Sequence, residues 1–394
     1  MQSNHRNGRT ILFVREVPWQ SYYPISTRML AGEFARDGWT VIWLTPPLLP
    51  WHNPHNKVGY EELLRQHRQG GLRPAENVFV YTPRGYVPFS RRFPLNQPLL
   101  AEWLWWGCLP PVRRVLRRAE LPEPDVLFVA NWISGGVRHL FPGVPVVFHV
   151  TDNYQHFPSS PATCARIQQR NYDRAAHVIV TAPSLKTLLE GQFGLAADRI
   201  TVTMQGVTPE RFTGEWAEPE ALAVCPHPRL VALGNPRWLD YDMLSALAQA
   251  FTAGSLVILG PRSAPVEGLA AARRNVFVLG SIPPERVPAC LAHCDVGLVL
   301  FGEHVRELAQ DVCPMKLFEY AAAGLPVVST PLPVYQTLDV PVWQASTPAE
   351  AIAAVHSALQ RAPEMRETMR AFARRHTWQQ KYQEVRQVID RLTG

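Results

Sequence analysis

Short runs of β-branched and aromatic residues alternate with stretches of helical periodicity along most of the chain. This alternation is typical of βαβ units that build parallel sheets. Seven runs predict the strands of a first sheet, at residues 10–16, 40–45, 78–82, 125–130, 144–150, 177–182 and 199–204. Six later runs predict a second sheet, at residues 229–234, 255–260, 275–280, 295–301, 326–330 and 340–343. The pattern therefore predicts two α/β domains.

Three stretches interrupt this alternation. Residues 206–228 are rich in Pro, Gly and acidic residues, which predicts a linker and places the domain boundary near Gly206. Residues 46–74 have no clear periodicity and are too long for a simple connection, which makes them a candidate functional loop. The tail from 348 to 392 predicts helices interrupted near Pro363 and again around His376 and Thr377.

Length and composition agree with two folded domains. The 394 residues exceed what one core usually supports, and 46% of them are hydrophobic. The formal charge of +6, carried mostly by Arg, favours anionic partners. Six cysteines without paired spacing fit a reducing compartment, and no signal stretch or run of about 18 apolar residues occurs. We expect a cytoplasmic protein, with contact to the inner face of the membrane as an open alternative.

The segment DVCPMKLFEYAAAGLPVVSTP (311–331) is the most informative in the chain. Pro314 suits a helix start, Met315 begins a helix that Gly324 can end, and PVVST is a short strand. A helix N-terminus at the edge of an open sheet offers N–H groups to a phosphate. Lys316 adds a cation there, and Glu319, one turn later, can accept hydrogen bonds from a ribose diol. The alternative is a solvated Lys–Glu pair on an ordinary amphipathic helix.

A second segment, RLVALGNPRWLDYDML (229–244), predicts a strand, a glycine-containing loop and a helix. Gly234 and Asn235 permit close backbone approach to a ligand, and Arg237 can reach an anion. A plain tight turn remains the alternative.

Segment 311–331 resembles the donor-binding motif of the retaining GT-B glycosyltransferases, and of the inverting bacterial glucuronosyltransferases that build exopolysaccharides. The resemblance implies that Lys316 binds the diphosphate and Glu319 the ribose, with the diphosphate against the loop at Gly234. Asp311 stands eight positions before Glu319, where many retaining members carry Glu. The predicted donor site comprises Gly234, Asn235, Arg237, Asp311, Met315, Lys316 and Glu319.

Further segments resemble the same enzymes. QGVTPERF (205–212) is similar to their linker motif, and 177–189 to their last N-terminal βα unit. The fold expected is GT-B, with two facing Rossmann-like domains and a cleft between them. Residues 1–205 would bind the acceptor and 206–376 the nucleotide-sugar donor, with a C-terminal helix (377–394) packing back on the first domain.

The segment FHVTDNYQHF (148–157), directly after a predicted strand, contains the candidate catalytic base. An inverting transferase needs a base beside the acceptor hydroxyl, and the string is similar to the segment that carries the catalytic Asp in the glucuronosyltransferases. Asp152 is the candidate, with His149 and His156 as alternatives. Asp152 could instead cap the helix that follows. In a retaining enzyme it would bind sugar.

Two apparent metal motifs are not favoured. Asp240-Tyr241-Asp242 spells a DxD sequence but opens a predicted helix, where acidic residues are ordinary. Cys290, His293, Cys294 and His304 lack the spacing of a zinc site, since the first three share one helical turn. We expect no metal and buried helical thiols instead.

Segment 101–120 combines three tryptophans with four arginines, at positions 103, 105 and 106 and at 113, 114, 117 and 118. Aromatic residues beside arginines suit the interface of an anionic membrane. The alternative is a core-packed aromatic turn followed by a solvated basic helix face. No nucleic-acid-binding motif accompanies the charge.

Together these features predict a metal-independent hexosyl- or glycuronosyltransferase that needs no cofactor. It would use a nucleoside-diphosphate sugar, with UDP favoured, and a glycan or lipid-linked saccharide acceptor in cell-surface polysaccharide synthesis. A nucleotide-sugar 2-epimerase of the same fold and a non-catalytic nucleotide-binding scaffold remain the alternatives.

Overall fold

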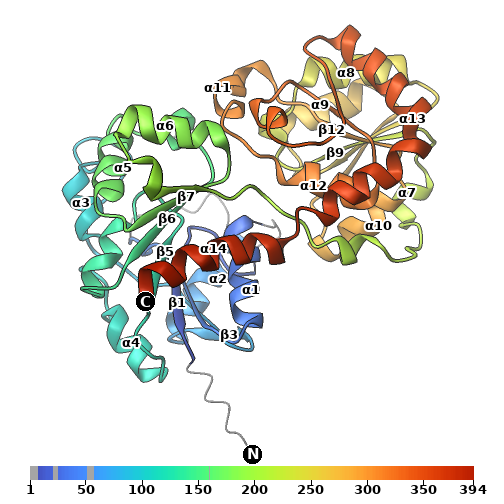
Figure 1. Cartoon of the computed structure of the whole chain (residues 1–394). Coiled ribbons are helices and arrows are strands. Elements are labelled where there is room, and N and C mark those ends of the chain that lie inside the picture. Colours follow the sequence, from blue (N-terminus) through green and yellow to red (C-terminus); the bar gives the residue numbers. More distant parts are fainter. Residues whose placement is uncertain (1–7, 21–24, 51–56, 159) are drawn as a thin grey trace, which may run out of the picture. The chain divides into compact units, whose positions relative to one another are not determined.

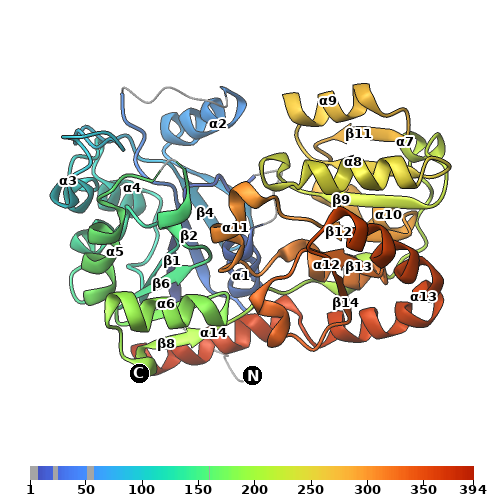
Figure 2. The same ribbon diagram turned by 90° about the horizontal axis from the view of Figure 1, so that it is seen from above.

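The computed structural model describes residues 8–20, 25–50, 57–158 and 160–394 (Figure 1). The chain divides into two compact units. The first contains Met1–Met204 together with Tyr382–Gly394, and the second contains Gln205–Lys381. Each unit has one open, mainly parallel sheet with helices packed against it, as both views show (Figures 1 and 2). The predicted fold class, two Rossmann-like α/β domains, is confirmed.

The first unit contains an eight-stranded sheet of order β3-β4-β2-β1-β5-β6-β7-β8. Its strands are β1 (Thr10–Val14), β2 (Thr40–Leu44), β3 (Leu72–Ala75), β4 (Val78–Tyr81), β5 (Val126–Val129), β6 (Val146–Val150), β7 (His177–Val180) and β8 (Ile200–Val202). All neighbours pair in parallel except β3 and β4. The central strands β1, β5 and β6 are buried along their whole length, because helices cover both faces of such a sheet.

The helices of the first unit connect its parallel strands. They are α1 (Ser26–Arg36), α2 (Lys57–Arg68), α3 (Pro98–Trp103), α4 (Val112–Arg118), α5 (Cys164–Asp173) and α6 (Pro183–Phe193). The last helix, α14 (Trp378–Thr393), also contributes to this unit from Tyr382 onwards. The Tyr382 hydroxyl donates to the Asp37 carboxylate over 2.5 Å, and its ring meets Phe34 edge-on with centres 4.7 Å apart. These contacts hold the C-terminal residues against α1.

The second unit contains a six-stranded sheet of order β11-β10-β9-β12-β13-β14, in which all neighbours are parallel. Its strands are β9 (Arg229–Leu233), β10 (Ser255–Leu259), β11 (Val276–Gly280), β12 (Val296–Val299), β13 (Val327–Ser329) and β14 (Val342–Gln344). Its helices are α7 (Glu220–Ala223), α8 (Tyr241–Ala250), α9 (Ala264–Ala272), α10 (Val287–Ala292), α11 (Arg306–Ala309), α12 (Met315–Ala323) and α13 (Pro348–Arg374).

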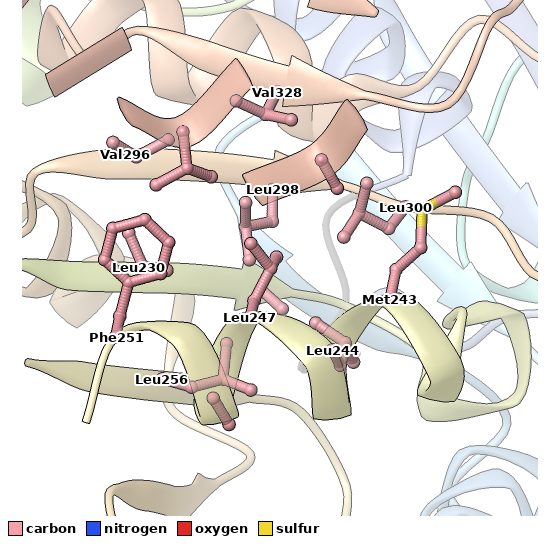
Figure 3. Packing of buried hydrophobic residues seen from close by; sticks show 14 of the residues in the cluster. Leu230, Met243, Leu244, Leu247, Phe251, Leu256, Val296, Leu298, Leu300 and Val328 are labelled. Carbon is pink, nitrogen blue, oxygen red and sulfur yellow. The ribbon is translucent and has the colours of Figure 1, made fainter. Parts of the chain in front are cut away.

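One core of the second unit lies between the sheet and α8, with further buried residues from α9 and α13 (Figure 3). Leu244 and Leu247 project from α8 onto Leu230 of β9 and Leu298 of β12, and all four side chains are buried. Burial of this apolar surface is what fixes the helix on the sheet and gives the strand ends defined positions.

Two sequence predictions are wrong. Residues 46–74 are not irregular, because α2 and β3 lie within them; residues 51–56 fall outside the described part. The predicted break near Pro363 does not occur, because α13 continues through this proline although it cannot donate a backbone hydrogen bond. The break around His376 and Thr377 is confirmed. Among the described helices, none combines the length and apolar character of a membrane span.

Candidate active site

In both sheets, successive strands are added first on one side of the starting strand and later on its other side. Ligands of open α/β proteins bind where this direction reverses, beyond the carboxyl ends of the strands. In the second unit the reversal lies between β9 and β12, which are neighbours. The loop after β9 contains Gly234, and the residue two positions after β12 is Phe301. Both loops therefore emerge at the same edge of the sheet.

Helix α12 begins at this edge. Pro314 occupies its N-cap position and supplies no side-chain hydrogen bond to the first turn. The Leu317 amide donates to the Pro314 carbonyl over 3.1 Å, which leaves the amides of Met315 and Lys316 for another acceptor. Gly324 ends the helix in the left-handed conformation with φ of 80°, which a residue without Cβ adopts without strain. The helix bounds match those predicted from the sequence.

Lys316 points from α12 toward the loop after β9. A Cβ atom at position 234 would lie 3.5 Å from the Lys316 Nζ, and Nζ lies 5.3 Å from the centre of the Phe301 ring. Gly234 has φ of 121°, which side-chain-bearing residues rarely adopt. The structure thus brings together the two predicted phosphate-binding elements, a helix N-terminus with its lysine and a glycine loop.

Tyr320 fixes this arrangement and was missed by the sequence analysis. Its buried hydroxyl accepts a hydrogen bond from the Leu233 amide over 2.8 Å and lies 3.1 Å from the Val231 carbonyl, to which it can donate. Tyr320 stands four residues after Lys316, on the same face of α12. The tyrosine therefore ties the helix to the end of β9 and places Lys316 beside Gly234.

Glu319 lies one turn after Lys316 and is half-buried. Burial raises the pKa of Glu319 to about 7, although the positive charges of Arg211 and Lys316 act in the opposite direction. Burial likewise lowers the pKa of Lys316 to about 8, against the opposing effect of Glu319. Arg211, which belongs to the segment predicted as a linker, is therefore a further charged neighbour of this site. Its guanidinium is held by the Pro284 carbonyl at 2.6 Å.

The other predicted donor residues differ in their surroundings. Asn235 is exposed and its side chain accepts from the Arg237 amide over 3.0 Å, which caps the short helix that follows. Arg237 is exposed. Asp311 is buried in the turn that precedes α12, and Met315 is the half-buried first residue of that helix.

The first unit carries a polar cluster at its own reversal point, between β1 and β5. Asp152 follows β6, and its carboxylate accepts a hydrogen bond from the Thr151 hydroxyl over 2.7 Å. The Tyr154 hydroxyl lies 3.4 Å from the same Thr151 oxygen and can donate to it. Burial raises the pKa of Asp152, while this hydrogen bond and the charge of Arg15 favour its ionised form.

Arg15 and Glu16, directly after β1, complete the cluster and were not singled out by sequence. The buried Arg15 guanidinium donates to the Ala130 carbonyl over 2.6 Å and lies 3.6 Å from the Glu16 carboxylate. Asn131, which follows β5, donates to Glu16 over 3.0 Å. Polar residues at the end of one predicted strand, TILFVRE, and directly after another, DVLFVA, were the available signal.

The structure shows where the alternatives to Asp152 as the base lie, namely a helix-cap role for Asp152 and the two nearby histidines. Asn153, not Asp152, caps the next short helix, by accepting from the Gln155 amide. His149 is buried within β6, 3.2 Å from the Thr27 hydroxyl, and burial together with Arg15 lowers its pKa to about 3. His149 is therefore neutral and enclosed, whereas His156 is exposed.

The residues of the two apparent metal motifs have other roles. Asp240 caps α8 by accepting from the Met243 amide over 2.9 Å. Cys290 and Cys294 are buried thiols, and the His293 and His304 rings bond different backbone carbonyls, those of Trp216 and Arg237. Among the described residues, no three His, Cys, Asp or Glu side chains are grouped as metal ligands.

Fold and site together define an α/β protein of two Rossmann-like units, each with polar residues at the reversal point of its sheet. Two family models match the chain: "Glycosyl transferase 4-like domain" over residues 25–206 and "Glycosyl transferase-like" over residues 240–387. Together they span most of both units. Both units therefore contain a glycosyltransferase domain of these families, and the fold is GT-B.

Solved structures of similar fold cover nearly the whole chain. Sucrose-phosphate synthase from Thermosynechococcus elongatus matches with a TM-score of 0.71 and 14% identity, over 98% of this chain and 99% of its own. HepE from Anabaena, solved in complex with UDP-glucose, has a TM-score of 0.65 and 17% identity, over 97% of this chain and 99% of its own. WaaG, a glycosyltransferase involved in lipopolysaccharide biosynthesis, has a TM-score of 0.58 and 15% identity, over 96% of this chain and 99% of its own. No curated protein matches the chain by sequence.

Proposed function

We propose that this protein transfers a hexosyl or glycuronosyl residue from a nucleoside-diphosphate sugar to an acceptor hydroxyl. The second unit would bind the donor and the first the acceptor. The observation that carries this proposal is the placement of the Lys316 ammonium beside Gly234 at the N-terminus of α12. This combination of cation, free amides and close backbone approach suits a diphosphate.

In the proposed reaction, the bond between the anomeric carbon and the diphosphate breaks as the acceptor oxygen bonds to that carbon from the opposite side. The diphosphate leaves with the bonding electrons, and Lys316 and the helix N-terminus stabilise its charge. We propose that this electrostatic arrangement replaces a metal ion, and that no cofactor is required.

Asp152 is the proposed base, which takes the proton from the acceptor hydroxyl as the new bond forms. Its raised pKa suits this role, because a base titrating closer to neutral pH accepts a proton more readily. The Thr151 hydrogen bond orients the carboxylate. Transfer by this route inverts the configuration at the anomeric carbon.

UDP is the proposed nucleotide, and a glycan or lipid-linked saccharide of cell-surface polysaccharide synthesis the proposed acceptor. HepE, of similar fold, was solved with UDP and UDP-glucose, and WaaG acts in lipopolysaccharide biosynthesis. All six cysteines are free and buried, in keeping with the proposed cytoplasmic location, where thiols stay reduced.

The test begins with thermal unfolding in the presence of UDP- and GDP-sugars, because a ligand that binds only the folded state raises its melting temperature. We expect UDP-sugars to give the larger rise. The UDP-sugar that binds is then incubated with saccharide acceptors, in buffer with EDTA. Formation of a glycosylated product supports the proposal. Epimerisation of the donor without acceptor, or binding without any turnover, would contradict it.

The affinity for UDP should pass through a maximum between about pH 7 and pH 8, the values to which burial shifts the pKa of Glu319 and of Lys316. Above pH 8 the free protein loses the Lys316 charge, so that affinity falls by at most about tenfold per pH unit. Below pH 7 Glu319 takes up a proton and can no longer accept hydrogen bonds from both ribose hydroxyls. Calorimetric titration with UDP across this range measures both effects.

Two variants separate these effects from titration of the ligand itself. Lys316→Met should remove the part of the fall in UDP affinity above pH 8 that comes from the protein. Glu319→Gln should remove the corresponding part below pH 7. Both variants are compared with the wild-type curve. If Lys316→Met bound UDP as tightly as the wild type and with the same alkaline decline, Lys316 would not contact the diphosphate.

A further inference from the structure

The net charge of the protein is concentrated in one short segment. Residues 84–118 contain seven arginines and a single acidic residue, Glu102. Their net charge of +6 equals that of the whole chain, so basic and acidic residues balance elsewhere. Glu102 is buried, forms an ion pair with Arg138 and is hydrogen-bonded to the His139 ring, which leaves the surface of the segment strongly positive.

The same segment carries nearly all the exposed large apolar side chains. Among the described residues seven are exposed, and six of these lie between positions 86 and 109: Tyr86, Phe93, Leu99, Trp103, Trp106 and Leu109. Phe93, Trp106 and Leu109 are the most exposed of the six, at 82%, 65% and 60%. Exposed apolar side chains that gather on one face of a protein mark an interaction surface.

Backbone contacts bring parts of the segment together. The Tyr86 amide donates to the Gly107 carbonyl over 3.0 Å, and the Leu109 amide donates to the Arg84 carbonyl over 3.0 Å. The chain segments that contain Tyr86 and Leu109 therefore lie next to each other. Leu99 and Trp103 are four residues apart on α3 and share one face of that helix.

Helix α4 follows these apolar side chains in the sequence and carries four exposed arginines. Val112, Val115 and Leu116 are buried, whereas the arginines at 113, 114, 117 and 118 are exposed. Arg113 lies over the Phe141 ring, 5.9 Å from its centre, and Phe141 lines a hollow of about 590 Å³ together with Trp106. Figure 1 shows α3 and α4 on the outside of the first unit's sheet.

The aromatic turn is only partly a core element. Trp105 is buried, as expected if the turn packs on the core, but Trp103 and Trp106 on either side of it are exposed. Arg113 is paired with Glu123, whereas no described carboxylate forms a salt bridge with Arg114, Arg117 or Arg118. The segment therefore carries both positive charge without a salt-bridge partner and exposed indole rings.

We infer that the surface of residues 84–118 binds the anionic face of a lipid bilayer. Trp103, Trp106 and Phe93 would enter the headgroup region, where amphipathic aromatic rings are favoured, and the arginines would contact lipid phosphates. A bilayer fits better than a protein partner, because binding to an anionic membrane requires exposed aromatic rings and an excess of basic residues. The segment has both, and its seven arginines are accompanied by only one acidic residue. The inference holds whether or not the chain transfers sugar.

Co-sedimentation of the full chain with lipid vesicles tests this inference. We expect binding to vesicles of phosphatidylcholine and phosphatidylglycerol in equal parts, and much weaker binding to phosphatidylcholine alone. Each arginine near an anionic surface is worth roughly fivefold in partitioning, so the triple variant Arg114→Gln, Arg117→Gln, Arg118→Gln should bind on the order of 100-fold more weakly. The double variant Phe93→Ser, Trp106→Ser should also bind less at high salt, where the apolar contribution dominates.

A matched control removes three exposed arginines from the second unit, through Arg274→Gln, Arg306→Gln and Arg361→Gln. This control should sediment like the wild type, although it carries the same net charge as the first triple variant. Circular dichroism checks that all variants are folded. Equal binding to both kinds of vesicle, or equal losses in the two triple variants, would overturn the inference.

Discussion

Replacing Lys316 with Met is expected to lower kcat for sugar transfer by about 100- to 1,000-fold, equivalent to about 2.7–4 kcal/mol of transition-state stabilisation. Met keeps much of the length of the lysine side chain but removes the charge that faces the leaving diphosphate next to Gly234. The loss should appear in kcat, because the diphosphate gains most of its charge as the glycosidic bond breaks. Steady-state transfer assays with the UDP-sugar donor provide the measurement.

The same substitution should not destabilise the protein. Burial lowers the pKa of Lys316 to about 8, so at neutral pH the folded state holds a charge that water would solvate better. Because this folded-state pKa lies below the unfolded value, the cost is fully present below about pH 8 and is relieved as pH rises further. We therefore expect an unchanged or higher melting temperature for Lys316→Met, and partial activity for Lys316→Arg. Near wild-type turnover in Lys316→Met would exclude the proposed donor site.

Replacing Asp152 with Asn is expected to lower kcat by about 100- to 10,000-fold, the usual contribution of a general base. Asn has nearly the same shape and can still accept the Thr151 hydrogen bond, but it cannot take a proton from the acceptor. Affinity for UDP should stay at the wild-type value, because the proposed donor residues belong to the other unit. Transfer assays and UDP titrations of the same preparation measure both quantities.

Asp173→Asn serves as the control, because it removes an exposed carboxylate from α5 in the same unit and should leave the rate unchanged. The anomeric configuration of the product, followed by NMR, supplies a second readout. Inversion together with a slow Asp152→Asn variant would support direct displacement. Retention of configuration, or a variant with full activity, would show that Asp152 does not act as the base.

The fold class could be predicted because each strand of a covered parallel sheet has to be apolar along its whole length. All seven strands predicted for the first sheet and all six for the second are present. The strand that was missed, β3, lies at the sheet edge and alternates between half-buried and exposed residues, so it lacks this signal. The break predicted at Pro363 does not occur, because packing outweighs the local preference of proline. Helix α13 packs against α8 and α12 and continues through this residue.

The proposed donor site could be predicted where its residues lie close together in sequence. Lys316 and Glu319 share one helix with Tyr320, and the loop at Gly234 faces Lys316. Arg211 was assigned only to a linker, because no local pattern relates it to a glutamate more than a hundred residues later. Its effect on Glu319 arises only when the short segment Pro209–Phe212 packs on α12.

The sequence by itself determined the two sheets, the helix at Met315 and the candidates Lys316 and Asp152, because these depend on periodicity and on residue types within a few positions. Tertiary structure alone decided that Arg15 joins Asp152, and that Trp105 is buried while Trp106 is exposed. The pKa values of Lys316 and Glu319 were also decided there. Burial and charge proximity depend on which distant segments meet in the folded chain, and local sequence carries no direct record of those distances.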